Sequence, residues 1–315
     1  MKQIKIQSKM IVALTGGIGG TKLILGFSKL LSKNQLTVIG NTGDDLELFG
    51  LRICPDLDTV TYTLGNLVNT ETGWGMKDDS FICLNTLKHL GEPSWFNLGD
   101  RDLATHLWRT SLIKQGNSLS QITEKMCQIL GVNCRLLPMT DSYTPTYLMT
   151  SQGKLHLQEY LIREKCNPVV QELIYENIQN ASPSPGISEA ILNADGVIIC
   201  PSNPFISIGP ILAVPGIREL LIQTDAPIFA ITPIVNQKAC KGPTAKMLEE
   251  LDYPVSPVTI ATLYRDFLDI FVLDNQDVQM REEIETMGLK VVVTNTVMNN
   301  NQEKTRLANE LLEML

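Results

Sequence analysis

Short apolar runs alternate with helical patterns along most of the chain. The runs are rich in Val, Ile and Leu and end at Gly, Pro, Asn or Asp, which is typical of strands buried on both faces of a parallel sheet. They occupy 10–14 (MIVAL), 36–40 (LTVIG), 196–200 (GVIIC), 227–231 (PIFAI), 269–274 (DIFVLD) and 290–295 (KVVVTN). The pattern predicts an α/β protein with a Rossmann-like three-layer α/β/α core around a parallel sheet.

The central third of the chain has a different pattern. Residues 55–131 are helical in pattern, and a serine cap is expected at Ser118. The segments 134–139 (CRLLPM), 146–151 (TYLMTS) and 154–162 (KLHLQEYLI) alternate like strands and predict a small separate sheet. A polar, proline-containing stretch at 176–190 reads as an exposed linker. We therefore expect one discontinuous α/β domain over 1–315, with a mostly helical insertion at about 60–190.

Composition narrows the function. The chain carries 34 acidic and 26 basic residues, a formal charge of -8, which disfavours general binding to nucleic acid or anionic membranes. The seven cysteines include no CxxC pair, so we expect neither a zinc site nor a disulfide framework. The first apolar run, 11–14, is too short for a signal peptide or a membrane span, and a cytoplasmic location is expected.

A glycine-rich turn joins the first strand to the first helix. It reads TGGIGGTKL and contains Gly16, Gly17, Gly19 and Gly20, followed by Lys22. Glycines there let the backbone approach a phosphate, which the following helix N-terminus attracts. The spacing is neither a P-loop nor a GxGxxG fingerprint, and a purely structural turn is the alternative.

Four carboxylates follow the second strand. Asp44 and Asp45 lie in NTGDD, and Asp56 and Asp58 in PDLDT. Such a cluster repels itself unless a cation or hydroxyl donors occupy it, and magnesium prefers oxygen ligands. In an extended segment Asp56 and Asp58 would point the same way; in a helix they would lie about 200° apart. Asp58 could instead cap a helix.

The segment LGDRDLATHLWR, 98–109, is dense in reactive side chains. Asp102 and His106 are spaced to share one face of a helix, and Arg101 or Arg109 could clamp a phosphate. The alternative is a solvated helix start with ordinary ion pairs.

Two polar loops follow later strands. PSNP places Ser202 and Asn203 between prolines after GVIIC, at the edge of the sheet where ligands bind. KGPTAKM offers Lys241 and Lys246 to an anion. Together these loops favour a phosphate and metal site for phosphoryl or phosphodiester transfer.

Several of these motifs, in this order, resemble the 2-phospho-L-lactate transferase family of coenzyme F-420 biosynthesis. The carriers are GGIGGTKL, NTGDD, GLRICPDLDTVTYTLG, GWG, LGDRDLATHLWRT, PSNPFISIGPILAVPGIR and KGPTAKM. The resemblance implies transfer of a phospholactyl or phosphoenolpyruvyl group from a guanosine diphosphate-activated donor to 7,8-didemethyl-8-hydroxy-5-deazariboflavin (FO), with release of GMP. It also implies a magnesium requirement, a homodimer, and contact between Asp58 and the deazaflavin. Asn97 stands where some members carry a charged residue.

We accordingly assign three groups of site residues. Asp58 and Asp45 are the predicted catalytic groups, and Asp44, Asp45 and Asp56 the predicted Mg²⁺ ligands. The predicted substrate-binding residues are Gly16, Gly17, Gly19, Gly20, Lys22, Asp58, Asn97, Arg101, His106, Ser202 and Asn203. The leading alternative is a non-enzymatic, UDP-sugar-binding regulator of the same fold, whose family lacks PDLDT and LGDRDxxTH. A dinucleotide-dependent oxidoreductase would need a clean glycine fingerprint.

Overall fold

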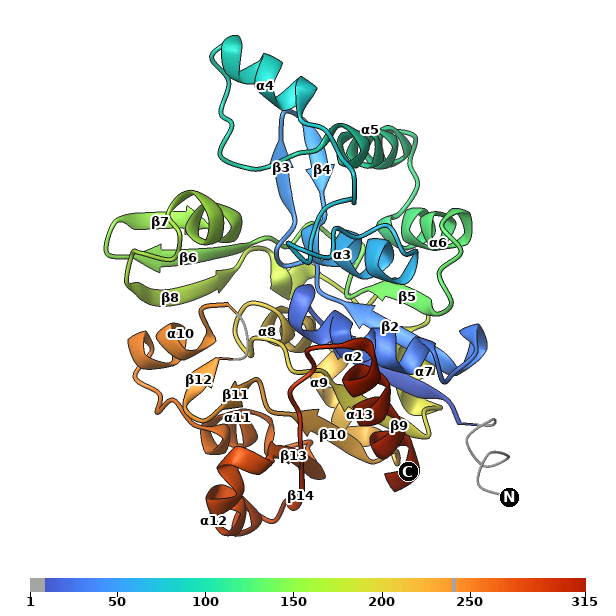
Figure 1. Cartoon of the computed structure of the whole chain (residues 1–315), viewed down its shortest axis with the longest axis vertical. Helices are drawn as coiled ribbons and strands as arrows, with labels where there is room; N and C mark the ends of the chain where they lie inside the picture. The colour runs from blue at the N-terminus through green and yellow to red at the C-terminus, as the bar shows by residue number, and fades with distance from the viewer. Residues whose placement is uncertain (1–8, 240–241) are drawn as a thin grey trace.

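A seven-stranded parallel sheet forms the centre of the computed structural model, which describes residues 9–239 and 242–315 (Figure 1). Its order is β14-β13-β10-β9-β1-β2-β5, and each neighbouring pair is parallel. The strands are β1 (Ile11–Thr15), β2 (Leu36–Gly40), β5 (Arg135–Pro138), β9 (Gly196–Ile199), β10 (Ile228–Ile231), β13 (Ile270–Asp274) and β14 (Lys290–Thr294). The six strands predicted from apolar runs are all present.

Helices cover both faces of the sheet because alternate strand residues point to opposite sides. In β1, Ile11 and Ala13 pack into one apolar cluster and Val12 and Leu14 into another. The first cluster contains residues of α2 (Ile18–Ser28), α3 (Pro55–Leu64), α6 (Leu119–Ile129) and α13 (Asn301–Met314). The second contains residues of α7 (Ile187–Leu192), α8 (Ile208–Ala213), α9 (Ile217–Gln223), α11 (Pro257–Tyr264) and α12 (Arg281–Glu285). This arrangement confirms the three-layer α/β/α prediction.

The small sheet differs from the prediction in its membership. CRLLPM forms β5, which pairs with β2 at the edge of the main sheet, so its assignment to the small sheet is wrong. Three of its four strand residues are buried, as suits a strand covered on both faces. The small antiparallel sheet has the order β7-β6-β8 and consists of β6 (Thr146–Thr150), β7 (Gly153–His156) and β8 (Val170–Tyr175). Between β7 and β8 lies a π-helical turn, η2 (Glu159–Arg163).

The helical part of the central third projects from the sheet at the top of Figure 1. It contains α4 (Ile82–His89) and α5 (Asp100–Lys114), beside a hairpin of β3 (Leu46–Leu48) and β4 (Leu51–Ile53). Ser118 caps α6 in a capping box with Gln121, as predicted. The remaining elements are η1 (Lys33–Gln35), η3 (Ile178–Asn180), β11 (Ile234–Val235), β12 (Lys238–Ala239), α10 (Thr244–Glu250) and η4 (Asn275–Met280). Within the described ranges, no helix has the length and apolarity that crossing a membrane requires.

Candidate functional site

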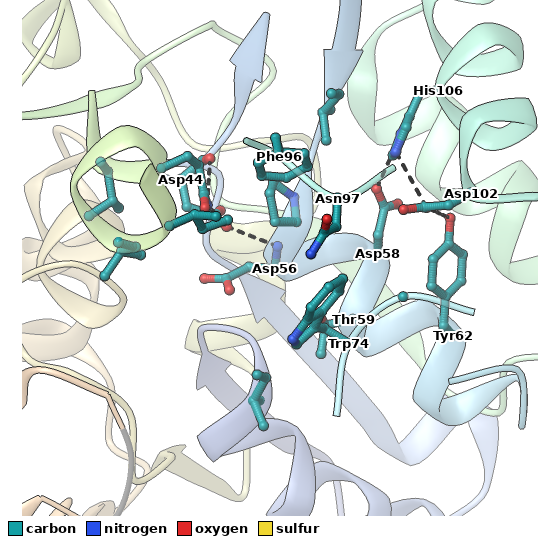
Figure 2. Close-up of a pocket in the computed structure, with 18 of the residues that line it drawn as sticks. Asp44, Asp56, Asp58, Thr59, Tyr62, Trp74, Phe96, Asn97, Asp102 and His106 are labelled. Atoms are coloured by element: carbon teal, nitrogen blue, oxygen red, sulfur yellow. Dashed lines mark hydrogen bonds and ion pairs between the residues drawn. The ribbon is translucent and has the colours of Figure 1, made fainter. Parts of the chain in front are cut away.

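A cavity of about 300 Å³ lies where the loops after β1, β2 and β9 meet the small sheet and α5. Parallel sheets commonly bind ligands at this edge. Four carboxylates line it, from Asp44, Asp56, Asp58 and Asp102 (Figure 2). Among the described residues that line it, none is Lys or Arg. The apolar part of the lining is made by Ile18, Ile53, Phe96, Leu157, Leu161, Ile162 and Ile206, with Trp74 also lining the cavity.

Helix α3 decides how the acidic side chains are distributed. Pro55 occupies its first turn, where a missing N–H removes no helical hydrogen bond, and Cys54 is the N-cap residue. Asp56 and Asp58 are therefore both helical, and they point to different sides of the cavity, as Figure 2 shows. The helix alternative left open by the sequence is the correct one. The interpretation of Asp58 as a helix cap is wrong, because Asp58 lies inside the helix.

Asp56 and Asp44 form the first acidic group. The Asn41 side-chain amide donates to Asp56 Oδ2 at 2.8 Å, and the Asp56 backbone N–H donates to Asp44 Oδ2 at 3.1 Å. Burial raises the pKa of Asp56 to about 6. Burial, reinforced by the charges of Asp56 and Asp45, raises the pKa of Asp44 well above its usual range. Asp44 Oδ1 is buried and has no hydrogen-bond partner within residues 9–239 and 242–315.

This first group fits a small divalent cation. Two adjacent buried carboxylates with raised pKa values are stabilised when a positive charge binds beside them. The unpartnered Asp44 Oδ1 supplies a free ligand atom. Magnesium is commonly held by one or two protein carboxylates together with substrate phosphates. Asp44 and Asp56 provide two such carboxylates here.

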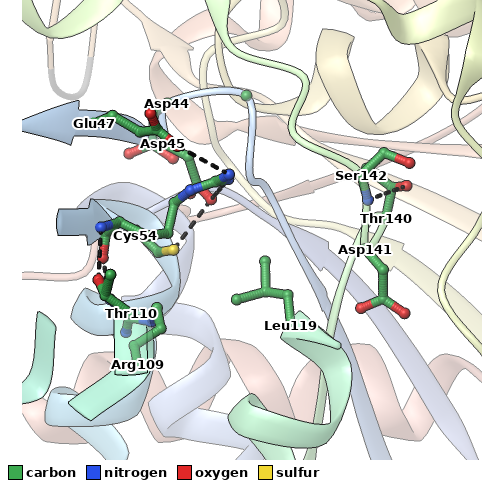
Figure 3. Close-up of polar contacts among 12 residues, drawn as sticks. Asp44, Asp45, Glu47, Cys54, Arg109, Thr110, Leu119, Thr140, Asp141 and Ser142 are labelled. Atoms are coloured by element: carbon green, nitrogen blue, oxygen red, sulfur yellow. Dashed lines mark hydrogen bonds and ion pairs between the residues drawn. The ribbon is translucent and has the colours of Figure 1, made fainter. Parts of the chain in front are cut away.

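Asp45 lies apart from this group. Its Oδ2 accepts a hydrogen bond from Cys54 Sγ at 3.0 Å (Figure 3) and lies 3.6 Å from Arg52 Nη1. Burial raises the pKa of Asp45 to about 7, although Arg52 opposes the shift. Asp45 does not line the cavity. Among the described residues, Asp45 Oδ1 also has no hydrogen-bond partner. The roles of Asp45 as a Mg²⁺ ligand and catalytic group stay predictions.

Asp58 belongs to a second group, which contains a basic side chain. Arg109 grips both of its carboxylate oxygens; Arg109 Nη1 lies 3.1 Å from Asp58 Oδ2, and Nη2 contacts Oδ1. Burial would lower the pKa of Arg109, but the charge and hydrogen bond of Asp58, together with Cys54 and Tyr62, outweigh it and raise that pKa, so the guanidinium stays charged. Arg109 is only 1% exposed. It is therefore a structural partner of Asp58 and not a free phosphate clamp.

His106 and Asp102 complete this second group. Arg109 Nη1 lies 3.3 Å from His106 Nδ1 and can only donate, which assigns the ring proton to Nε2. Nε2 lies 3.3 Å from Asp102 Oδ1 but is poorly aligned for a hydrogen bond. The Tyr62 hydroxyl donates to the same oxygen at 2.7 Å. Burial would raise the pKa of Asp102, but these contacts outweigh it and lower that pKa.

The second group also brings three metal-type ligands together. One ligand atom each from Asp58, Asp102 and His106 falls within 4.8 Å of the others. Arg109 already neutralises Asp58 from the buried side. Arg109 therefore supplies one positive charge to this group, whereas no Lys or Arg among the described residues that line the cavity does so for Asp44 and Asp56, which makes the Asp44–Asp56 group the better cation site.

The glycine turn is enclosed by other loops. A Cβ on Gly17 would overlap the Asp56 carboxylate, and one on Gly20 would overlap Thr15 and crowd Ser202. The Gly16 N–H donates to Ser202 Oγ at 3.3 Å. The glycines thus allow close packing of the loops, whatever else they bind.

The remaining predicted residues are spread around the site. His106 and Asn97 line the main cavity, whereas Gly19 and Lys22 line a second cavity of about 180 Å³ on the other side of the glycine turn. Asn203 Oδ1 accepts from the Phe205 and Ile206 N–H groups and so shapes its own loop.

Two predicted anion-binding side chains are engaged elsewhere. Arg101 donates to the Lys77 carbonyl and does not line the main cavity. Lys246 is paired with Glu250. Lys241 lies outside the described residues.

Sequence reasoning missed several residues that line the cavity. Tyr62 and Phe96 gave no local signal. Gln158 and Leu161 lay in a segment interpreted as a strand, and only the tertiary structure brings that segment to the cavity. Trp74 belongs to the GWG motif, which was noted only for the resemblance.

Comparison with known proteins identifies the family. Residues 11–311 match the family described as 2-phospho-L-lactate transferase CofD. A phosphoenolpyruvate transferase of Streptomyces griseus is 39% identical over 96% of this chain and 98% of its own length. A 2-phospho-L-lactate transferase of Methanocaldococcus jannaschii is 38% identical over 96% and 97%.

A solved structure shares the fold at much lower identity. It is a UPF0052 family protein of Bacillus halodurans, which covers 97% of this chain and 99% of its own with a TM-score of 0.65 and 16% identity. Identity this low carries the fold and not the function. The family match and the curated relatives together show that this chain belongs to the 2-phospho-L-lactate transferase family and is a transferase.

Proposed function

We propose that the protein transfers a phospholactyl or phosphoenolpyruvyl group from a guanosine diphosphate-activated donor to FO, releasing GMP, in coenzyme F-420 biosynthesis. The carrying observation is the cavity beside the glycine turn, which combines apolar and acidic lining residues. Its apolar and aromatic residues, with Phe96 and Trp74, suit a flat deazaflavin ring, and its carboxylates suit a cation and an alcohol.

The charge of the cavity supports a magnesium requirement. Four carboxylates line it and, over the described part of the chain, no Lys or Arg does. A diphosphate would be repelled there without a counter-charge. Asp44 and Asp56 would hold Mg²⁺, which when bound neutralises phosphate charge and positions the donor.

Asp58 is proposed to act on the acceptor alcohol. Its carboxylate lines the cavity and is held in one orientation by Arg109. It can accept the hydrogen bond of the ribityl hydroxyl and direct that oxygen at the phosphorus bearing the acid, taking the proton as the new O–P bond forms. The bond from that phosphorus to the oxygen of GMP breaks, and GMP leaves with the electron pair.

The direct test is mass spectrometry of the products. FO is incubated with the protein, magnesium and either the phospholactyl or the phosphoenolpyruvyl guanosine diphosphate donor. We expect FO to gain the mass of one phospholactyl or phosphoenolpyruvyl group, which is the phospho-acid less one water, with an equal amount of GMP. Saturable FO binding without product would overturn the transferase proposal for these donors. We also propose that the protein is cytoplasmic and forms a homodimer. Light scattering of the purified protein would test whether it is a dimer.

A further inference from the structure

Two side chains at the end of the small sheet contact the turn that contains Asp44 and Asp45, which we call the acidic turn. His156 ends β7, and Gln158 precedes the π-helical turn η2. His156 Nε2 lies 3.0 Å from the Asp45 carbonyl oxygen. The Gln158 side-chain amide donates to the Asp44 carbonyl oxygen and to Asp44 Oδ2, both at 3.2 Å. More than 110 residues of chain separate the donors from the acceptors.

Both donors are themselves held in place. The Gln158 backbone N–H donates to His156 Nδ1 at 3.1 Å, which leaves the ring proton on Nε2 and aims it at Asp45. The edge of this ring also packs against Tyr147, with ring centroids 5.3 Å apart. His156 and Gln158 are 9% and 5% exposed. The contacts are therefore buried and directional.

The consequence is visible in the Asp44 carboxylate. Oδ2 accepts two hydrogen bonds, one from Gln158 and one from the Asp56 backbone N–H. Oδ1 is buried and, in the part of the chain that the structure describes, has no hydrogen-bond partner. With one oxygen fixed by two donors, the carboxylate cannot rotate freely, and the other oxygen keeps one direction. Groups that orient a ligand in this way commonly determine much of its metal affinity.

We propose that Gln158, supported by His156, is a positioning residue that orients Asp44 for a divalent cation. This inference rests on the cation site of the proposed function. It gives the small sheet a role in the reaction, because the segment that orients Asp44 also lines the cavity through Leu157 and Leu161.

The test measures binding of Mn²⁺, an oxygen-preferring and paramagnetic stand-in for Mg²⁺, to the metal-free whole protein by electron paramagnetic resonance, alone and with GDP. Gln158→Met keeps the side-chain length and removes both amide hydrogen bonds. We expect the Mn²⁺ dissociation constant to rise about 10-fold or more, the usual effect of losing a group that orients a ligand. Should this variant prove unstable, Gln158→Asn retracts the amide by one methylene and gives the same comparison.

The matched control is Tyr175→Phe. The Tyr175 hydroxyl donates to the Phe205 carbonyl at 2.5 Å and ties the same small sheet to the core without touching the acidic turn. It should lower the melting temperature and leave the Mn²⁺ dissociation constant unchanged. If the wild type binds Mn²⁺ and the folded Gln158 variant has the same Mn²⁺ dissociation constant, the inference is overturned but the cation site is not. If the wild type binds no Mn²⁺ with or without GDP, the cation site itself is refuted.

Discussion

Asp56 and Asp58 leave the same helix two residues apart, yet they meet opposite surroundings. Asp56 lies beside Asp44, no ion pair joins it to a basic side chain among the described residues, and burial raises its pKa to about 6. Asp58 is gripped through both oxygens by the buried Arg109. The first environment is short of positive charge, whereas the second already contains it.

The comparison teaches how one helix can present two chemical groups. A turn of α-helix rotates successive side chains by about 100°, so alternate residues face nearly opposite sides. The Asp56 side is suited to recruiting a cation. The Asp58 side is suited to a fixed acceptor for an alcohol. Four expected results would sharpen or break this division.

The largest effect should come from removing divalent cations. EDTA should abolish turnover and added Mg²⁺ should restore it. The reason is that Asp44 and Asp56 bring negative charge, and no described Lys or Arg lines the cavity to balance the charge of a diphosphate. Product formation is followed by mass spectrometry. Full activity in EDTA would show that this side does not need a cation.

Asp58→Asn should lower kcat on the order of 10²-fold, the usual size of a general-base contribution. GDP affinity, measured by calorimetry, should change little. The variant also leaves Arg109 buried beside a neutral group, and breaking a buried ion pair costs about 3–5 kcal/mol of unfolding free energy. Its melting temperature should therefore fall.

A double variant separates these two effects of Asp58. Asp58→Asn combined with Arg109→Met removes both charges and should recover much of the stability. If turnover recovers with it, Asp58 acts only as the partner of Arg109. If turnover stays low, the carboxylate has a role in the reaction.

Gly17→Val should weaken GDP binding about tenfold, or about 1.4 kcal/mol. The added side chain would overlap the Asp56 carboxylate as well as occupy space beside the glycine turn. In an Asp56→Ala background, which removes the overlapping atoms, a smaller effect of Gly17→Val would assign part of the loss to displacement of Asp56. Unchanged GDP affinity in a folded Gly17→Val protein would show that GDP does not bind at this turn.

The smallest effect should be on the pH dependence of stability. The pKa values of Asp56 and Asp45 are raised to about 6 and about 7 in the folded protein. The folded state therefore binds protons more tightly than the unfolded state. That contribution to stability is fully present below the unfolded pKa and is lost as pH rises through about 6 to 7.

The metal-free protein should accordingly melt at a lower temperature at about pH 8 than at about pH 5.5, where one kcal/mol corresponds to a few degrees. Mg²⁺ should raise the melting temperature more at the higher pH, because there it does not compete with protons. Calorimetric scans with and without Mg²⁺ measure both. An equal Mg²⁺ effect at both values would mean that Asp44 and Asp56 are not its ligands.

Much of the fold could be predicted from the sequence. Six strands of the main sheet are continuous apolar runs, and Asp44, Asp56 and Asp58 follow one of them, which ends at Gly40, within 18 positions. Burial on both faces makes a strand hydrophobic at every position, a local property that survives without knowledge of its neighbours. The edge strand β5 was misassigned because its short, mixed pattern does not say which sheet it joins.

The identity of the site's partners was decided only by the tertiary structure. The sequence placed four carboxylates in one region, but Arg109 reaches Asp58 from 51 residues away and Gln158 reaches Asp44 from 114. Those distant side chains decide whether a buried carboxylate is free to bind a cation or is already paired with a basic side chain. Hydrophobic periodicity is a local property of the sequence, whereas electrostatic pairing depends on which residues the fold brings together in space.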